Sequence, residues 1–422
     1  MQFEMEDKMN FLDKAKRTGD WIVNNQYVSH PDWDAKPFED FDMNEDMNYG
    51  RFVRNYDLTA KKVTHLSTNW ISGMTIYGLL MLRGLSGDDK YLESSLKGSY
   101  YLKSLQNVMD ANPAYRGAFS ERITSNRWCA PRDALSAAWG ILRLYQSTGD
   151  SEFLVRSEMF ADWHMRNAMP DGYPIGYFFF GEKPNKEFLA NCQGGSALYY
   201  YDLYRTTGKE IYLVPMLKIV DYYVENFIND DGSINIYFDR KTGKPGDDDS
   251  AWADMHKYND DFSALGILAA YEVTGDKKYL DSVIKYMNWT VSRQNPETGG
   301  FGTMELSVSS CVGALNCLNL YLITGDNRFL KSGRKAMAHL DKYVIDCPDD
   351  LRIHGGVLGL NVCEVAEQND VLCLRVSMYA LYSFTLYHLY DRYGENDRLG
   401  DIPEKLVNNP MFLGLRLKKE IE

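Results

Sequence analysis

The sequence predicts an all-α fold in which six helical hairpins close into a ring, an (α/α)6 toroid. Three observations predict it: a turn motif that recurs about every 60 residues, two kinds of helix that flank each motif, and a difference in length between the two sets of connections. Because one ring of hairpins accounts for the whole chain, we expect residues 1–422 to form a single domain.

The recurring turn combines a glycine, an aspartate in four of five copies, and an aromatic–leucine pair. Glycine can end one helix in the left-handed conformation, and the aspartate can cap the next helix. The aromatic–leucine pair then docks that helix. The copies are LSGDDKYLESS (85–95), STGDSEFLVRS (147–157), TTGKEIYLVPM (206–216), VTGDKKYLDSV (273–283) and ITGDNRFLKSG (323–333), with RYGENDRL (392–399) as a degenerate sixth.

The helices before and after each turn differ in their distribution of apolar residues. Residues 133–146 are apolar on nearly every face, which is typical of a buried helix, whereas residues 277–294 carry one apolar stripe with a 3.6-residue period. Strand patterns of period two are nearly absent, and the repeat is longer than the roughly 33–47 residues of a helical solenoid. We expect inner helices near 69–85, 132–147, 191–206, 259–273, 307–323 and 369–393, and outer helices near 9–26, 89–107, 151–167, 209–228, 277–294 and 327–345.

The turns from inner to outer helices are short, whereas the connections from outer to inner helices are long. Long connections inside a compact domain usually carry function. All six should emerge at the face where the inner helices begin, and unpaired N–H groups and helix dipoles make that face favourable for anions. We therefore expect the functional site among the connections 27–68, 108–131, 168–190, 229–258, 295–306 and 346–368.

The composition excludes several classes of function. A net charge of −13 over 422 residues argues against nucleic acid or an anionic membrane as a partner, and no apolar segment reaches the roughly 18 residues needed to span a bilayer. Seven scattered cysteines without a Cys-x-x-Cys pair predict neither a disulfide framework nor a structural zinc site, and we expect no metal and no other cofactor. The beginning of the chain shows no signal peptide, so we expect a bacterial protein of the cytoplasm, or of the periplasm if a leader has been removed. A homodimer is compatible with the sequence.

Aromatic residues are frequent in the long connections. Flat rings suit the apolar faces of sugars, and the polar tips of tryptophan and tyrosine suit their hydroxyl groups, so these residues indicate a carbohydrate site. The alternative is that a chain with 14% aromatic residues must place some of them in loops. The residues concerned are Trp33, Trp70, Trp128, Trp252, Tyr115, Tyr173, Tyr177 and Tyr237.

The second long connection concentrates positive charge. It carries Arg116, Arg122, Arg127 and Arg132 in an otherwise acidic protein. The planar guanidinium group binds a carboxylate through two parallel hydrogen bonds, so these arginines predict recognition of a uronate or another acidic sugar. The alternative is that they pair with carboxylates of the loops, such as Glu121.

Five carboxyl groups lie at or just before the expected starts of inner helices: Asp133, Asp260, Asp261, Glu305 and Glu364. Hydrolysis of a glycoside needs one carboxyl that holds a proton near pH 7 and one that stays ionised. Each aspartate could instead be a helix cap. The adjacent pair is more informative, because one cap is enough: we expect one of Asp260 and Asp261 to cap the helix and the other to enter the cavity as acid or base.

The segment before that pair offers a second chemistry. His256 and Tyr258 could serve as acid and base and line the substrate, while Asn259 neutralises a uronate carboxylate, which is the logic of β-elimination in polysaccharide lyases. A metal site built from His256, Asp260 and Asp261 has no recognised spacing, so we do not expect one.

Two motifs resemble a known family. HKYNDDFSALG (256–266) is similar to the His-x-x-x-Asp-Asp/Leu pattern of unsaturated glucuronyl hydrolases, and APRDALSAAWG (130–140) is similar to their Arg-Gly-Asp/Asn segment. The two motifs occur here in the reverse order, and Arg132 replaces the glycine. Over its full length the chain resembles the six-hairpin glycosidase superfamily. The resemblance implies an exo-acting enzyme on oligosaccharides that contain uronic acid, of the unsaturated glucuronyl hydrolase or toroidal β-glucuronidase type, with Asp133 as general acid and base.

The main interpretation is a glycoside hydrolase whose partner is an oligosaccharide with an acidic sugar. The alternatives are a polysaccharide lyase and a sugar-binding toroid without catalysis, and sugar epimerases and cyclases share the toroid turns. The candidate catalytic residues are Asp261, Asp260, Asp133, Glu305, His256 and Tyr258. The candidate substrate-binding residues are Arg116, Arg127, Trp128, Arg132, Trp70, Gln193, Trp252, His354 and Arg375.

Overall fold

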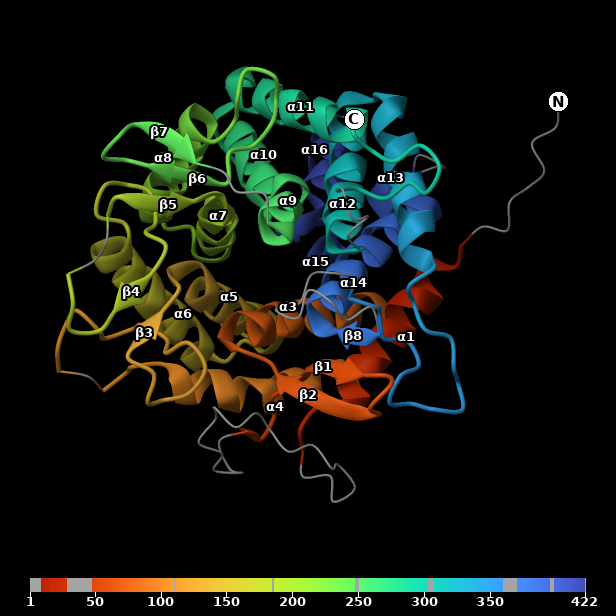
Figure 1. The fold of residues 1–422 in the computed structure, drawn as a ribbon, viewed down its shortest axis with the longest axis horizontal. Helices are drawn as coiled ribbons and strands as arrows, with labels where there is room; N and C mark the ends of the chain where they lie inside the picture. Colours follow the sequence, from red (N-terminus) through yellow and green to blue (C-terminus); the bar gives the residue numbers. More distant parts are fainter. Residues whose placement is uncertain are drawn as a thin grey trace.

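The computed structural model describes residues 9–28, 48–109, 111–183, 186–246, 250–302, 307–359, 370–394 and 398–421. Two concentric rings of helices form an (α/α)6 toroid, as the sequence predicts (Figure 1). The inner ring consists of α3 (Asn69–Ser86), α5 (Pro131–Thr148), α7 (Ser196–Thr207), α10 (Ser263–Thr274), α12 (Ser307–Thr324) and α14 (Leu374–Leu389). The outer ring consists of α1 (Phe11–Asn24), α4 (Lys90–Leu105), α6 (Ser151–Trp163), α8 (Leu213–Asn226), α11 (Lys277–Ser292) and α13 (Asn327–Asp341).

The five complete copies of the turn motif make the expected turns. The glycine that follows each inner helix is in the left-handed conformation, with φ between 69° and 75°. The following aspartate accepts a hydrogen bond from the backbone of the outer helix in four turns. The glycines are Gly87, Gly149, Gly208, Gly275 and Gly325, and the aspartates are Asp88, Asp150, Asp276 and Asp326.

The degenerate sixth motif does not make this turn. Gly394 lies in a π-helical turn, η4 (Tyr390–Gly394), that continues α14, and it is not left-handed. The sixth inner helix instead packs against α1, so the ring is closed by elements from opposite ends of the chain.

Short strands occur in the long connections, where the sequence analysis expected almost none. Each has only two to five residues, which is too short for an alternating pattern to stand out. All of their pairings are antiparallel, and they fix the connections at one end of the ring. One sheet contains β2 (Lys62–Leu66), β1 (Val53–Asp57) and β8 (Val371–Cys373), a second contains β3 (Trp128–Cys129) and β4 (Phe178–Phe179), and a third contains β5 (Phe188–Ala190), β6 (Tyr237–Asp239) and β7 (Lys244–Gly246).

The C-terminal segment enters the ring. It comprises η5 (Leu399–Asp401), α15 (Glu404–Val407), η6 (Pro410–Phe412) and α16 (Leu413–Ile421), and α16 packs against both α10 and α12 (Figure 1). The Asn319 side chain of α12 donates to the Met411 carbonyl at 3.0 Å and accepts from the Gly414 N–H at 2.8 Å. These bonds satisfy buried backbone groups of the segment, so the segment is part of the core.

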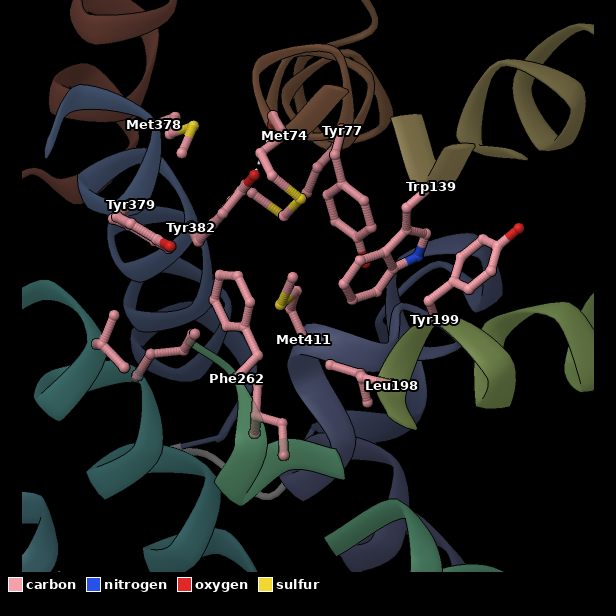
Figure 2. Packing of buried hydrophobic residues seen from close by; sticks show 14 of the residues in the cluster. Met74, Tyr77, Trp139, Leu198, Tyr199, Phe262, Met378, Tyr379, Tyr382 and Met411 are labelled. Carbon is pink, nitrogen blue, oxygen red and sulfur yellow. Dashed lines mark hydrogen bonds between the residues drawn. The ribbon is translucent and has the colours of Figure 1, made fainter. Parts of the chain in front are cut away.

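Met411 occupies the middle of the inner ring. Figure 2 shows its side chain between Phe262 of the segment before α10 and the rings of Tyr77 and Trp139 on α3 and α5. Met411 is fully buried, and Tyr77 donates a 2.5 Å hydrogen bond to the side chain of the nearby Asn409. The lumen of the toroid is therefore filled with side chains at this level.

Two inner helices touch backbone to backbone. A Cβ atom added to Gly73 of α3 would lie 2.1 Å from the carbonyl oxygen of Ser136 on α5, and one added to Gly140 would lie 2.4 Å from the carbonyl oxygen of Gly73. Only glycine permits this approach, which sets the position of the first turn of α5.

The α3–α5 contact leads to a prediction about stability. Gly73→Ala should lower the free energy of unfolding by about 1–3 kcal/mol, because the added methyl group forces the two helices apart, and this loss outweighs the gain of about 1 kcal/mol in helix propensity. Urea denaturation measures it. Gly400→Ala is the control, because a Cβ atom there meets nothing within 4 Å. Equal midpoints for the two variants would contradict the contact.

Candidate active site

Asp260 caps an inner helix. It lies between a short helix, α9 (Ala251–Tyr258), and α10, and its carboxylate accepts hydrogen bonds from the Phe262 N–H at 3.2 Å and the Ala264 N–H at 2.7 Å. The Asn316 side chain donates a third bond at 3.4 Å. Asp260 is fully buried, and this burial raises its pKa to about 6 although the hydrogen bonds oppose the shift.

The side chain of Asp261 contacts different residues from that of Asp260. Asp261 and Phe262 both have left-handed backbone conformations, with φ of 51° and 73°, which are strained for residues other than glycine. The Asp261 carboxylate forms an ion pair with Arg132 of α5 (Nε to Oδ2, 3.1 Å) and accepts a 2.7 Å hydrogen bond from the Tyr379 hydroxyl of α14. A Cβ atom added to Gly195 would lie 1.9 Å from the Asp261 carbonyl oxygen, so η2 (Asn191–Gly195) is a third element that contacts the turn. Of the adjacent pair, Asp261 is thus the one that faces other functional groups.

A second pair of carboxyl groups lies at the start of α5. Asp133, in the first turn of the helix, is half-buried, and its side chain shares a hydrogen bond with that of the buried Glu121. Glu121 also accepts a 3.0 Å hydrogen bond from the Ala130 N–H. Two carboxyl groups form a hydrogen bond only when one of them carries a proton.

The proton of this pair resides on Asp133. Burial, the charge of Glu121 and the shared hydrogen bond raise the pKa of Asp133 well above its usual value, and the charge of Asp261 adds to the shift. Burial also raises the pKa of Glu121, but the hydrogen bonds from Asp133 and Ala130 oppose that shift. The site therefore combines Asp133, whose pKa is raised, with Asp261, whose carboxylate is paired with Arg132. Sequence reasoning placed Asp133 among the candidates but missed Glu121 as its partner, because Glu121 lies in a loop without a periodic pattern.

Arg375 supplies a positive charge that forms no ion pair with a carboxylate of the described residues. It lies in the first turn of α14, is half-buried, and places its guanidinium carbon 5.3 Å from the ring centre of Trp70. Among the residues that the structure describes, Arg375 has no ion-pair partner and its buried Nε atom has no hydrogen-bond partner. A guanidinium group in this state is suited to bind an anion.

Two residues that interact with both Asp261 and Arg375, His256 and Cys192, are uncharged near pH 7. His256 is buried; burial and then the charge of Arg375 lower its pKa to about 3, although Asp261 opposes the shift. Burial and then the charge of Asp261 raise the pKa of the half-buried Cys192 thiol to about 12, although the positive charges of Arg132 and Arg375 oppose the shift. Both groups therefore stay uncharged near pH 7. Since these residues affect one another's pKa values, they lie close enough to form one cluster, which consists of Cys192, His256, Arg132, Asp133, Asp261 and Arg375.

The neighbouring amides point to a ligand or bound water. Gln193 is almost fully buried, and its Oε1 atom has no hydrogen-bond partner within the described ranges. The same holds for Oδ1 of Asn191, whose Nδ2 atom donates to the His256 carbonyl at 3.1 Å. Buried acceptors of this kind are usually satisfied by a bound molecule.

The arginines of the second connection do not converge. Arg132 reaches the cluster, where it is bound to Asp261. Arg127 is exposed and lies over the ring of Tyr115, and Arg116 lines a surface cavity of about 710 Å³ beside α6, together with residues such as Lys209. Arg116, Arg127 and Arg132 therefore do not share one carboxylate site, because the loop directs these three side chains to different surroundings.

Tyr258 and His354, both predicted as site residues, make structural contacts: Tyr258 packs against other aromatic rings, and His354 bonds within a turn. The Tyr258 ring stacks on Trp289 of α11 at 5.4 Å and on Phe301 at 6.2 Å, because Tyr258 ends α9 instead of beginning an inner helix. His354 accepts a 3.1 Å hydrogen bond from the Cys347 N–H within its own connection. Glu305, Glu364, His30, Trp33 and the side chain of Trp252 lie outside the described residues.

The described residues contain neither a candidate metal site nor a candidate membrane-spanning helix. No group of three or more histidine, cysteine, aspartate or glutamate side chains there could hold a metal ion. No helix in the same ranges has the length and apolarity to span a bilayer.

Comparisons with known proteins place this geometry in context. Residues 215–352 match the model of the β-L-arabinofuranosidase GH127 catalytic domain, and no curated protein matches the sequence. Over 89% of this chain and 98% of the other, the fold is similar to a cellobiose 2-epimerase from Bacillus thermoamylovorans, with 12% identity and a TM-score of 0.66. The fold is also similar to an unsaturated glucuronyl hydrolase specific for heparin, with 14% identity and a TM-score of 0.63 over 90% of this chain and 97% of the other. It is similar as well to a family 76 α-mannanase from Bacteroides thetaiotaomicron, with 14% identity and a TM-score of 0.63 over 92% of this chain and 97% of the other.

These solved structures share the (α/α)6 toroid fold with this chain. The solved structures fix the fold only, since they share less than 15% identity with this chain. The match to a glycoside hydrolase catalytic domain, which covers part of the ring, supports glycosidase activity.

The cap formed by Asp260 generates a pH-dependent prediction. Its folded-state pKa of about 6 exceeds the usual value of 3.8, so the native state retains a proton that the unfolded state loses as the pH rises above about 4. Between pH 4 and 7 the wild type should therefore lose roughly 3 kcal/mol of stability relative to Asp260→Asn, which cannot titrate. Chemical denaturation at several pH values measures the difference.

Asp326→Asn serves as the control for that measurement. Asp326 caps α13 at an exposed turn, and hydrogen bonds from Arg328 lower its pKa, so its contribution is lost as the pH falls instead. If the two variants show the same pH dependence, Asp260 is not held as the structure shows.

The Glu121–Asp133 pair generates a prediction about titration. Glu121→Gln removes a negative charge and supplies an amide that can donate to the Asp133 carboxylate, so the pKa of Asp133 should fall. The pKa is measured by following the carboxyl carbon resonance with pH in carbon NMR of aspartate labelled at that carbon. The Asp133→Asn variant identifies which resonance belongs to Asp133. An unchanged pKa would contradict the shared proton.

Proposed function

We propose that the protein is a glycoside hydrolase that acts on oligosaccharides containing a uronic acid. The observation that carries the proposal is the Glu121–Asp133 pair, because it raises the pKa of Asp133 well above its usual value, as a general acid requires. Asp133 donates its proton to the oxygen of the scissile bond as general acid. Asp261, ionised in its pair with Arg132, stabilises the positive charge that develops on the sugar and orients the attacking water.

The uronate carboxylate binds Arg375. Its guanidinium group lacks a carboxylate partner among the described residues, and Trp70 holds it at the start of α14, where the helix dipole also favours an anion. This assignment replaces the arginines of the second connection as the source of specificity for an acidic sugar.

The alternatives have less support from the geometry. A lyase that uses Tyr258 and His256 needs both side chains at the substrate, whereas Tyr258 stacks between Trp289 and Phe301. A sugar-binding toroid without catalysis has no use for a carboxyl group with a strongly raised pKa.

The test compares glycosides that differ only in the carboxylate. 4-Nitrophenyl β-D-glucuronide and disaccharides that end in a 4,5-unsaturated uronide should react faster than 4-nitrophenyl β-D-glucoside. Asp133→Asn should lower kcat about 10²- to 10⁴-fold. Arg375→Ala should raise KM for the acidic substrates about tenfold or more, because a charge-assisted contact is lost. Arg328→Ala, which changes an exposed arginine of the outer helix α13, is the control and should change neither constant.

Other outcomes would identify other activities. Equal rates on glucoside and glucuronide would remove the case for carboxylate recognition. Release of a new unsaturated uronate would identify a lyase, a changed configuration without bond cleavage would identify an epimerase, and binding without turnover would identify a sugar-binding protein.

A further inference from the structure

Three aromatic rings lie on the outward face of the sheet formed by β3 and β4. Trp128 and Phe179 are cross-strand partners, and Tyr177 lies two residues before Phe179 on the same face, with ring centres 6.1 to 6.5 Å apart. The other face, with Cys129 and Phe178, is buried. Tyr177 and Phe179 are 57% and 46% exposed, so the sheet presents apolar rings to solvent.

A second aromatic pair continues this surface. Phe188 of β5 is 47% exposed, and its ring centre lies 4.6 Å from that of Tyr237 on β6. The two sheets are adjacent, since a Cβ atom added to Gly176 would lie 3.9 Å from the Phe188 carbonyl oxygen. Both lie along the same side of the ring in Figure 1.

The surface begins at the candidate active site. Burial and then electrostatic interactions with Asp133, Cys192 and Glu121 raise the pKa of Tyr177, so its ring lies near the Glu121–Asp133 pair. The Glu121 N–H donates to the Trp128 carbonyl at 3.2 Å, so the same strand that presents Trp128 also holds Glu121. The aromatic rings of the β3–β4 sheet are thus linked through the backbone of Trp128 to Glu121 of the acid–base cluster.

We propose that Trp128, Tyr177, Phe179, Phe188 and Tyr237 form an aromatic face that binds the sugar units beyond the cleaved bond. Flat, partly exposed rings in a row match the apolar faces of consecutive sugars, and continuity with the acid–base cluster gives the row a direction. The occupant is the remainder of the oligosaccharide substrate, so the protein prefers long chains to disaccharides. The location of the cleaved bond rests on the proposed function.

Substrates of different length test the aromatic face. The probes are a disaccharide and a hexasaccharide with the same 4,5-unsaturated uronide at the non-reducing end. Wild type should show a lower KM for the hexasaccharide. Phe179→Ala and Phe188→Ala should each raise that KM about two- to tenfold and leave the KM for the disaccharide unchanged. The matched control is Tyr100→Ala, because Tyr100 on α4 is 57% exposed, as Tyr177 is.

Binding to an inactive variant separates the aromatic face from the proposed function. In the Asp133→Asn background, calorimetry should show tighter binding of the hexasaccharide than of the disaccharide, and Phe179→Ala should remove the difference. This result would hold even if no substrate were cleaved, in which case only the proposed function fails.

Two outcomes would overturn the inference. One is equal binding of both lengths by the wild type and by the Asp133→Asn variant. The other is a Phe179→Ala variant that binds both lengths normally but shows less self-association in sedimentation, since the aromatic face would then be an interface between copies of the protein.

Discussion

The ion pair between Arg132 and Asp261 joins the inner ring across the site. Burying two charges is costly unless both are paired and their remaining hydrogen-bonding groups are satisfied. Here Arg132, which is 4% exposed, also donates to Ser136 at 2.5 Å and to the Asp261 carbonyl at 3.3 Å, and Asp261 accepts from Tyr379. The pair ties α5 to the turn before α10 and, through Tyr379, to α14. The left-handed turn at Asp261 and Phe262 persists because these partners hold it from several elements at once.

The same arrangement gives four neighbouring carboxyl groups four different states. Asp260 caps a helix, Asp261 is an ion-pair partner, Glu121 accepts a hydrogen bond from the Ala130 N–H, and the pKa of Asp133 is raised by burial and by Glu121. Acid–base chemistry needs such a separation of protonation states, which burial and neighbouring charges produce without any change of residue type. The start of α5 is central to this, because it carries both Arg132 and Asp133, and its position follows from the glycine contact with α3.

Sequence reasoning succeeded where local patterns determine structure. The glycine–aspartate turns and the two kinds of helix predicted both rings, and the starts of inner helices predicted the neighbourhood of Asp133 and Asp261. The cap and the outward carboxylate of the Asp260–Asp261 pair follow the expected division, whereas their catalytic roles stay predictions. The sequence could not show the path of the connections, so it misplaced Arg116 and Tyr258 and missed both Glu121 and the C-terminal segment. Those features depend on contacts between residues far apart in the chain, for which periodicity carries no signal.

The C-terminal segment has a consequence for how the ring is made. During synthesis the first five hairpins emerge in order, each stabilised by contacts with its neighbours along the chain. Closure of the ring needs α14 to pack against α1, and filling of the lumen needs Met411 and α16; α14, Met411 and α16 all follow the first five inner helices in the chain. Until they are synthesised, the apolar inner surfaces of α3, α5 and α10 lack their central partner. We therefore expect an open ring that exposes apolar surface to persist until α16 has been synthesised, and a nascent chain of this kind is a typical substrate for chaperones.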